Sequence, residues 1–171
     1  MLTGFTPRLL AALLWLLVSL SNAQGATLPE PSGRVLLTVS GAIASTNVGG
    51  EARFDRAMLE ALPSRVIETH TPWHRGNGRF EGPLIRGLLE IVGVDGDHVH
   101  IRALDDFEAE VPVADLHSYD VILAMTRNAE PLGIREFGPL FVLYPFDAHP
   151  ELLNEAVRFR SVWHVERIIV P

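Results

Sequence analysis

Hydrophobic and polar residues follow short, regular patterns along most of the chain. Apolar runs or two-residue alternation, both typical of strands, occur at 34–40, 64–69, 98–103, 107–111, 119–126, 140–146 and 161–170. Helical spacing of apolar residues occurs at 54–62, 83–92 and 150–157. Strands outnumber helices and the helices are scattered, so the pattern predicts a mixed α+β domain around a largely buried sheet.

The first 23 residues have the three parts of a secretory signal peptide. Arg8 supplies a positive charge, residues 9–20 are apolar, and Ser21-Asn22-Ala23 offers a small-residue exit. The apolar run is shorter than the ~20 residues that cross a bilayer, which disfavours an uncleaved anchor. We therefore predict cleavage after Ala23, export to the periplasm without stable membrane insertion, a flexible tether at 24–33 and one domain at 34–171.

Composition excludes several classes of function. The 171 residues include 21 acidic and 14 basic side chains, for a net charge of −7, and every basic residue is Arg. This balance argues against nucleic-acid binding, which needs a basic surface. The absence of Cys excludes disulfides, zinc–thiolate sites, iron–sulfur clusters and a cysteine nucleophile.

Histidines are the remaining metal-ligand candidates. His98 and His100 lie two residues apart on a predicted strand, so both point to one face and can hold Zn²⁺ or Cu²⁺. No neighbouring sequence offers an obvious third ligand, so an exposed polar strand face is the favoured interpretation. His70 and His74 are four apart, but the step into Pro72 disfavours a helix there. We expect no metal site.

The sequence also gives little support to a hydrolase. No G-x-S-x-G elbow occurs, and Ser161, beside Arg160, has no recognisable general base. We therefore predict no catalytic residues.

Aromatic and charged residues in two irregular stretches are the best candidates for binding. Trp73 lies in the stretch 70–80 and Trp163 in the stretch 158–163. Trp offers a stacking face, and Arg or Asp offers in-plane hydrogen bonds, which suits a planar heteroaromatic ligand. Ordinary core packing explains the two Trp residues equally well. The pair Asp105-Asp106 is expected at a turn, where a solvated role is the more common alternative.

Four segments in the C-terminal half resemble a known family. DVILA at 120–124, NAEPL at 128–132, GPL at 138–140 and RSV at 160–162 occur in the order found in the oxidoreductase molybdopterin-binding domain. That domain is the fold of sulfite oxidase and of the periplasmic methionine sulfoxide reductase. FEGPLIRGLLEIV at 80–92 also resembles a helix of this family. The resemblance covers 35–170 and implies a sulfite oxidase-like mixed sheet with a few short helices.

Departures from the family pattern change the expected ligand. The family places its molybdenum-ligating Cys after the strand that corresponds to 66–69, where this chain has Thr69-His70-Thr71. Phe141 and Trp163 replace basic residues that help to hold the cofactor's phosphate. The resemblance therefore implies an uncharged pterin without molybdenum; molybdopterin is disfavoured. A molybdenum-dependent oxidoreductase without the Cys ligand, or a structural protein without ligand, are the alternatives.

The segments TPW at 71–73 and YPFD at 144–147 resemble a Cys-less subgroup of small secreted proteins. These are described as periplasmic pterin-binding proteins that work with an inner-membrane sensor, typically one whose cytoplasmic part makes or degrades cyclic di-GMP. The resemblance implies a similar partner here. Asp106 is expected to meet the amino-pyrimidinone edge, with Asp105 as the next candidate. The expected pterin-binding residues are Thr71, Trp73, Asp106, Phe141, Tyr144, Arg160, Ser161 and Trp163.

Overall fold

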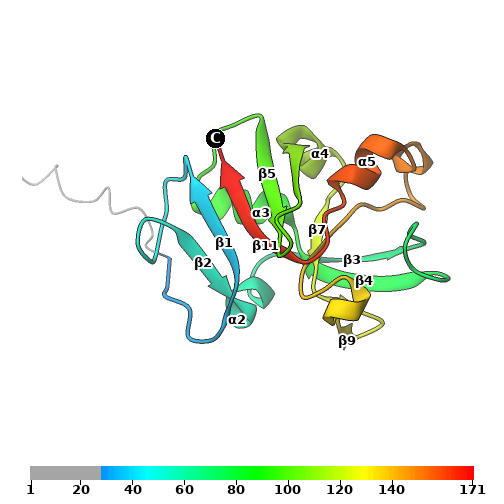
Figure 1. Cartoon of the computed structure of the whole chain (residues 1–171), viewed down its shortest axis with the longest axis horizontal. Helices are drawn as coiled ribbons and strands as arrows, with labels where there is room; N and C mark the ends of the chain where they lie inside the picture. The colour runs from blue at the N-terminus through cyan, green and yellow to red at the C-terminus, as the bar shows by residue number, and fades with distance from the viewer. Residues whose placement is uncertain (1–27) are drawn as a thin grey trace, which may run out of the picture.

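Residues 28–171, the part of the chain that this computed structural model describes, form a mixed α+β domain with three sheets (Figure 1). The predicted α+β class is therefore confirmed. The predicted signal peptide lies outside the described residues. Across residues 28–171, none of the helices has the length and apolar character that a bilayer crossing requires.

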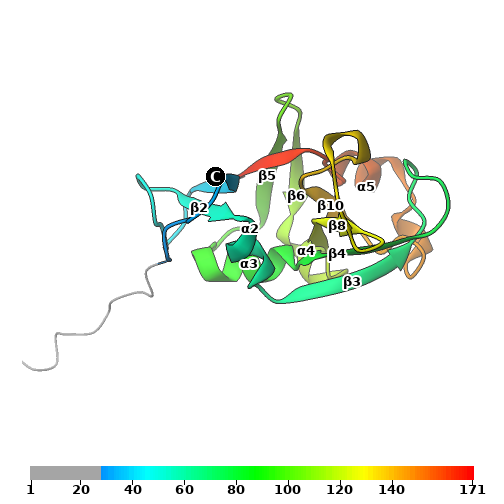
Figure 2. The same ribbon diagram turned by 90° about the horizontal axis from the view of Figure 1, so that it is seen from below.

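A five-stranded sheet forms one end of the molecule (Figure 1). β1 and β11 are parallel, and the other neighbouring strands are antiparallel. The helices α2 (Arg56–Glu60) and α3 (Ile85–Val92) lie against one face (Figure 2), where the alternating apolar residues of the strands are buried. In spatial order the strands are β2 (Ala52–Asp55), β1 (Val35–Gly41), β11 (Val165–Val170), β5 (His98–Ala103) and β6 (Glu108–Pro112).

The opposite face of this sheet is polar, as the alternation predicts. Arg102 on β5 pairs with Glu108 on β6 at 3.0 Å, and Arg167 on β11 pairs with Glu51 at 2.8 Å. The first pair joins residues that lie opposite each other on neighbouring strands, where opposite charges favour the observed register. The second spans β1, because Glu51 comes just before β2 and β1 lies between β2 and β11.

The other end of the molecule contains an antiparallel sheet and a buried strand pair. Gly82 allows the two to pack closely, because a Cβ at this position would lie 2.0 Å from the carbonyl oxygen of Leu123. The antiparallel sheet comprises β3 (Ser64–Thr69), β4 (Gly78–Pro83), β8 (Thr126–Arg127) and β9 (Glu130–Pro131), and the pair comprises β7 (Ile122–Ala124) and β10 (Phe141–Leu143). The remaining elements are α4 (Val113–Ser118), α5 (Glu155–Arg160) and the 3₁₀ helices η2 (Ile134–Glu136) and η3 (Pro150–Leu152).

Two predicted helices begin later than their apolar spacing indicated. The prediction at 54–62 is corrected because Ala52–Asp55 is strand β2, and α2 begins only after Asp55. The prediction at 83–92 is corrected at its start, since Pro83 is the last residue of β4. The end of that helix is as predicted, with Gly93 in the left-handed conformation at φ 70°.

The C-terminal half differs more from the sequence prediction. Three predicted strands are shorter in the structure. The strand predicted at 119–126 corresponds to β7 and the start of β8, the one at 140–146 to β10, and the one at 161–170 to β11. The helix predicted at 150–157 divides into η3 and α5, because the Asn154 side chain accepts a hydrogen bond from Val157 N and starts a new helix. α4 was not predicted, since it is only 6 residues long and has no side-chain cap.

Asp55 ties the start of the domain to α2. Its carboxylate accepts hydrogen bonds from Met58 N at 2.9 Å and from the backbone N–H groups of Ser32 and Gly33 at 2.8 Å each. The end of the predicted tether is therefore held against the domain. These donors, the Met58 N–H first, lower the pKa of Asp55 below its ordinary value.

Replacing Asp55 by Asn should flatten the dependence of stability on pH. Because the pKa is lower in the folded chain, the carboxylate stabilises the fold above pH ~4, and this contribution disappears as the pH falls through the lowered pKa. The melting temperature of Asp55→Asn should lie below wild type at pH 7 and approach it at pH 3. Asp95→Asn, which changes an exposed carboxylate, is the matched control. An equal gap for Asp55→Asn at both pH values would contradict this account.

Candidate functional site

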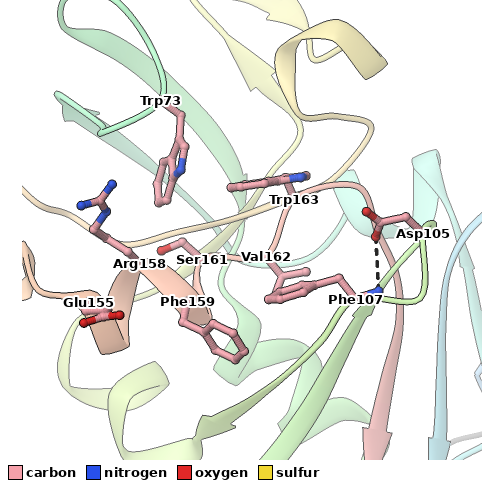
Figure 3. Close-up of a pocket in the computed structure, with 9 residues that line it drawn as sticks. All are labelled: Trp73, Asp105, Phe107, Glu155, Arg158, Phe159, Ser161, Val162 and Trp163. Carbon is pink, nitrogen blue, oxygen red and sulfur yellow. Dashed lines mark hydrogen bonds between the residues drawn. The ribbon is translucent and has the colours of Figure 1, made fainter.

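A pocket of about 360 Å³ opens where four segments meet. The segments are the loop between β3 and β4, the β5–β6 turn, α5, and the residues that lead from α5 into β11. Its volume is within the usual range for small-molecule sites. In Figure 3, Trp163 lies across one side of the pocket and Phe107 and Phe159 lie on the other. The lining residues are Trp73, Asp105, Phe107, Glu155, Arg158, Phe159, Ser161, Val162 and Trp163.

Trp73 reaches the pocket because the loop after β3 is tightly turned. The hydroxyl oxygen of Thr71 accepts a hydrogen bond from His74 N at 3.1 Å, and it lies 2.9 Å from His74 Nδ1. Thr71 was predicted to contact the ligand. Its side chain is instead buried and shapes the turn that presents Trp73.

An aromatic cluster fixes the two indoles. The rings of Trp73 and Trp163 meet edge to face with centroids 5.7 Å apart, and Phe141 meets Trp73 at 5.6 Å. Phe141 is 0% exposed, so the expectation that it faces a ligand is not met. All three residues of β10 are buried, and the Phe141 ring packs edge to face against Trp73 inside the protein.

Tyr144 and Arg160 are held by a residue that the sequence analysis missed. Arg160 Nη1 donates to the Asp115 carboxylate at 2.9 Å, and the buried Tyr144 hydroxyl donates to the same oxygen at 3.3 Å. Burial, together with Asp115, raises the pKa of Tyr144. Neither predicted residue lines the pocket. Arg160 connects the end of α5 to α4, and Tyr144 connects the segment after β10 to α4. The isolated position of Asp115 in the sequence gave no signal for this role.

Ser161 lines the pocket, as predicted, with most of its side chain buried. Its hydroxyl donates to the carbonyl of Val157 at 2.9 Å and so completes the end of α5. The hydroxyl donor is therefore used within the protein. Only the lone pairs of this oxygen remain for a ligand.

The two acidic residues at the β5–β6 turn, Asp105 and Asp106, have different roles. Asp106 is exposed, has φ 66° and donates its N–H to Ala103 O at 3.1 Å, so it forms the turn. Asp105 lines the pocket, and its carboxylate accepts a hydrogen bond from Phe107 N at 3.3 Å (Figure 3). Of this pair Asp105, the next candidate in the sequence, lines the pocket, and Asp106 does not.

α5 adds one positive and one negative side chain to the pocket. Glu155 and Arg158 are three residues apart, so they lie on the same side of the helix. Both side chains are exposed at the pocket. Glu155 was missed because the apolar pattern placed this helix too early. Together with Asp105 they give the pocket two carboxylates and one guanidinium.

The loop after β3 is tied to the segment after Tyr144. His70 N and His70 Nδ1 contact the Asp147 carboxylate at 3.0 and 2.8 Å, and Asp147 N donates to the Thr69 hydroxyl at 3.0 Å. The hydrogen bond with His70 lowers the pKa of Asp147. His70 and His74 thus have separate partners and form no pair.

Comparisons with known proteins agree with the resemblance in the sequence. Residues 52–146, more than half of the chain, match the family model described as the oxidoreductase molybdopterin binding domain. Among solved structures, the sulfane dehydrogenase SoxCD from Paracoccus pantotrophus matches with a TM-score of 0.59 and 18% identity, over 78% of this chain and 37% of that chain. At this identity the match shows the fold alone, and this chain spans about a third of that chain's length. No curated protein gives a significant match.

Proposed function

Since the chain belongs to the oxidoreductase molybdopterin-binding domain family, we propose that it is a non-catalytic, periplasmic member that binds a pterin without molybdenum. In this proposal the bound or empty state is read by the periplasmic domain of an inner-membrane signalling protein. The observation that carries the proposal is a pocket lined by two Trp residues in a chain without Cys.

The residues near the family's metal position do not fit a molybdenum centre. The donors at the end of β3 and in the loop that follows are the Thr69 hydroxyl, the His70 imidazole and the Thr71 hydroxyl, and each has a partner within the protein. A hydroxyl or an imidazole is a harder donor than a thiolate and does not replace it on molybdenum. The donor set therefore supports binding without redox chemistry.

The aromatic residues support a planar ligand. Trp163 and Trp73 line one part of the pocket, and Phe107 and Phe159 line another. Stacked aromatic rings gain ~0.5–1.5 kcal/mol beyond the area they bury. Because Phe137 and Trp73 hold the Trp163 ring in place, little freedom is lost when a ligand stacks on it.

The charged residues support an uncharged pterin over a phosphorylated one. A carboxylate such as Asp105 can accept two hydrogen bonds from the amino group and ring N–H of an amino-pyrimidinone. Arg158 is the single cation among the lining residues, and Asp105 and Glu155 oppose a phosphate electrostatically. This charge balance favours the amino edge of a pterin ring over a phosphate tail.

Exposed residues at the pocket rim support the proposal that a partner protein reads the state of the pocket. Phe159 and Phe107 line the pocket and are 56% and 39% exposed, with their rings in edge contact at 5.0 Å. A pterin held between α5 and the β5–β6 turn would restrain both elements. These two rings would then present a fixed apolar surface to a sensor domain. A sensor that controls cyclic di-GMP is the partner that the sequence resemblance implies.

Trp163→Ala should weaken pterin binding more than about tenfold, because stacking and apolar burial are lost together. Calorimetry with free pterin measures the affinity, and melting temperature measures stability on the same protein. Tyr119→Ala removes an aromatic ring outside the pocket and is the matched control. A loss of stability in Trp163→Ala with unchanged affinity would reduce Trp163 to a packing role.

Asp105→Asn and Asp106→Asn form a matched pair within one turn. The first should weaken pterin binding by one to two decades, about 1.4–2.8 kcal/mol, because one acceptor and the charge are lost at the ligand edge. The second should leave affinity unchanged, since Asn tolerates the left-handed conformation and Asp106 lies outside the pocket. Equal effects of the two substitutions would refute the assignment of Asp105.

A further inference from the structure

We propose that His98, His100 and Glu110 form a binding site for a divalent transition-metal ion on the outer face of the five-stranded sheet. One ligand atom from each residue lies within 4.8 Å of those of the other two. Two imidazoles and a carboxylate, with no sulfur, suit Zn²⁺ and its neighbours in the first transition row. The site lies outside the pocket and does not depend on the proposed pterin.

Strand geometry supplies the third ligand that the sequence alone did not reveal. His98 and His100 are two apart on β5, so they share a face. Glu110 lies directly opposite His100 in the antiparallel pairing of β5 with β6. Side chains opposite one another on adjacent strands start about 4.5–5.5 Å apart, which places the carboxylate beside both rings.

The rings are separated and available for an ion. The His98 and His100 centroids lie 5.5 Å apart and the ring planes are inclined at 75°, so the imidazoles do not stack face to face. His98 and His100 are partly exposed and Glu110 is exposed, and all three lie on the antiparallel pair of β5 and β6. Zn²⁺ bonds to nitrogen and oxygen are about 2.0–2.2 Å long, so small side-chain rotations close the observed spacing.

Neighbouring carboxylates contact Nδ1 of both histidines and so orient their rings. His98 Nδ1 is hydrogen-bonded to Asp97, and His100 Nδ1 lies 3.2 Å from a Glu108 oxygen. A carboxylate that accepts Nδ1–H fixes the tautomer in which Nε2 carries the lone pair for a metal. Glu108 is in turn held by Arg102 at 3.0 Å. Three protein ligands leave the fourth tetrahedral position for water.

Zinc binding to the untagged chain, measured by calorimetry without pterin, tests the site. The wild type should bind one Zn²⁺ per chain. Loss of a residue that only hydrogen-bonds to a metal ligand typically weakens metal binding roughly 10–100-fold. His100→Ala and Glu110→Gln each remove a direct ligand, so each should weaken zinc binding by at least that factor. His149→Ala, which removes another partly exposed histidine paired with a carboxylate, should bind Zn²⁺ like wild type.

The site is refuted if the wild type binds no zinc, or if His100→Ala and Glu110→Gln both retain wild-type affinity. An equal loss in His149→Ala would also refute it, since binding would then reflect surface histidines in general. Glu110→Gln changes an exposed side chain of nearly equal size, so it tests the site even if the His100 variant is unstable. If the Asp105 and Trp163 variants bound pterin normally, the proposed pterin site would fail, but the zinc measurement would still decide the metal site.

Discussion

The short backbone pairing between β10 and the segment that enters β11 holds the pocket together. Val142 N donates to Val162 O at 2.8 Å and Val165 N donates to Leu140 O at 3.0 Å, with Phe141 and Trp163 opposite each other. This pairing joins the buried strand pair to the five-stranded sheet. It also fixes Trp163 at the point where Trp73, α5 and the β5–β6 turn converge. Backbone geometry in the core therefore determines where the indole faces.

The sequence predicted the α+β class and most strands, because the alternation of apolar residues is strong where one face is buried. It failed where both faces are covered: in β10 three successive residues are buried, so no pattern showed that Phe141 points away from the pocket. The pocket residue Asp105 could not be told from Asp106 before the turn was known. Glu110 became a candidate ligand only through the pairing of β5 with β6, since its sequence position places it far from His98.

The chain has the fold of its family, and in the proposed function this fold binds a ligand without redox chemistry. The loop that follows β3 contains hydroxyl and imidazole groups that bond within the protein, and it presents Trp73 to the pocket. Aromatic residues occupy positions that the sequence resemblance assigns to basic ones. In the proposed function, the flat apolar faces, the carboxylate edge and the single guanidinium of the pocket form a reversible binding site. Phe107 and Phe159 at its rim are exposed, and in the proposed function they are the surface through which a partner protein reads the state of the pocket.

The most direct test is to denature the purified native protein and quantify the released pterin by fluorescence together with molybdenum by mass spectrometry. The account predicts one pterin per chain, without a phosphate or dithiolene group, and no stoichiometric molybdenum. Stoichiometric molybdenum would contradict it and favour an oxidoreductase that binds the metal without a protein thiolate. Absence of any pterin, with no binding of added pterin to the refolded chain, would contradict the binding function itself.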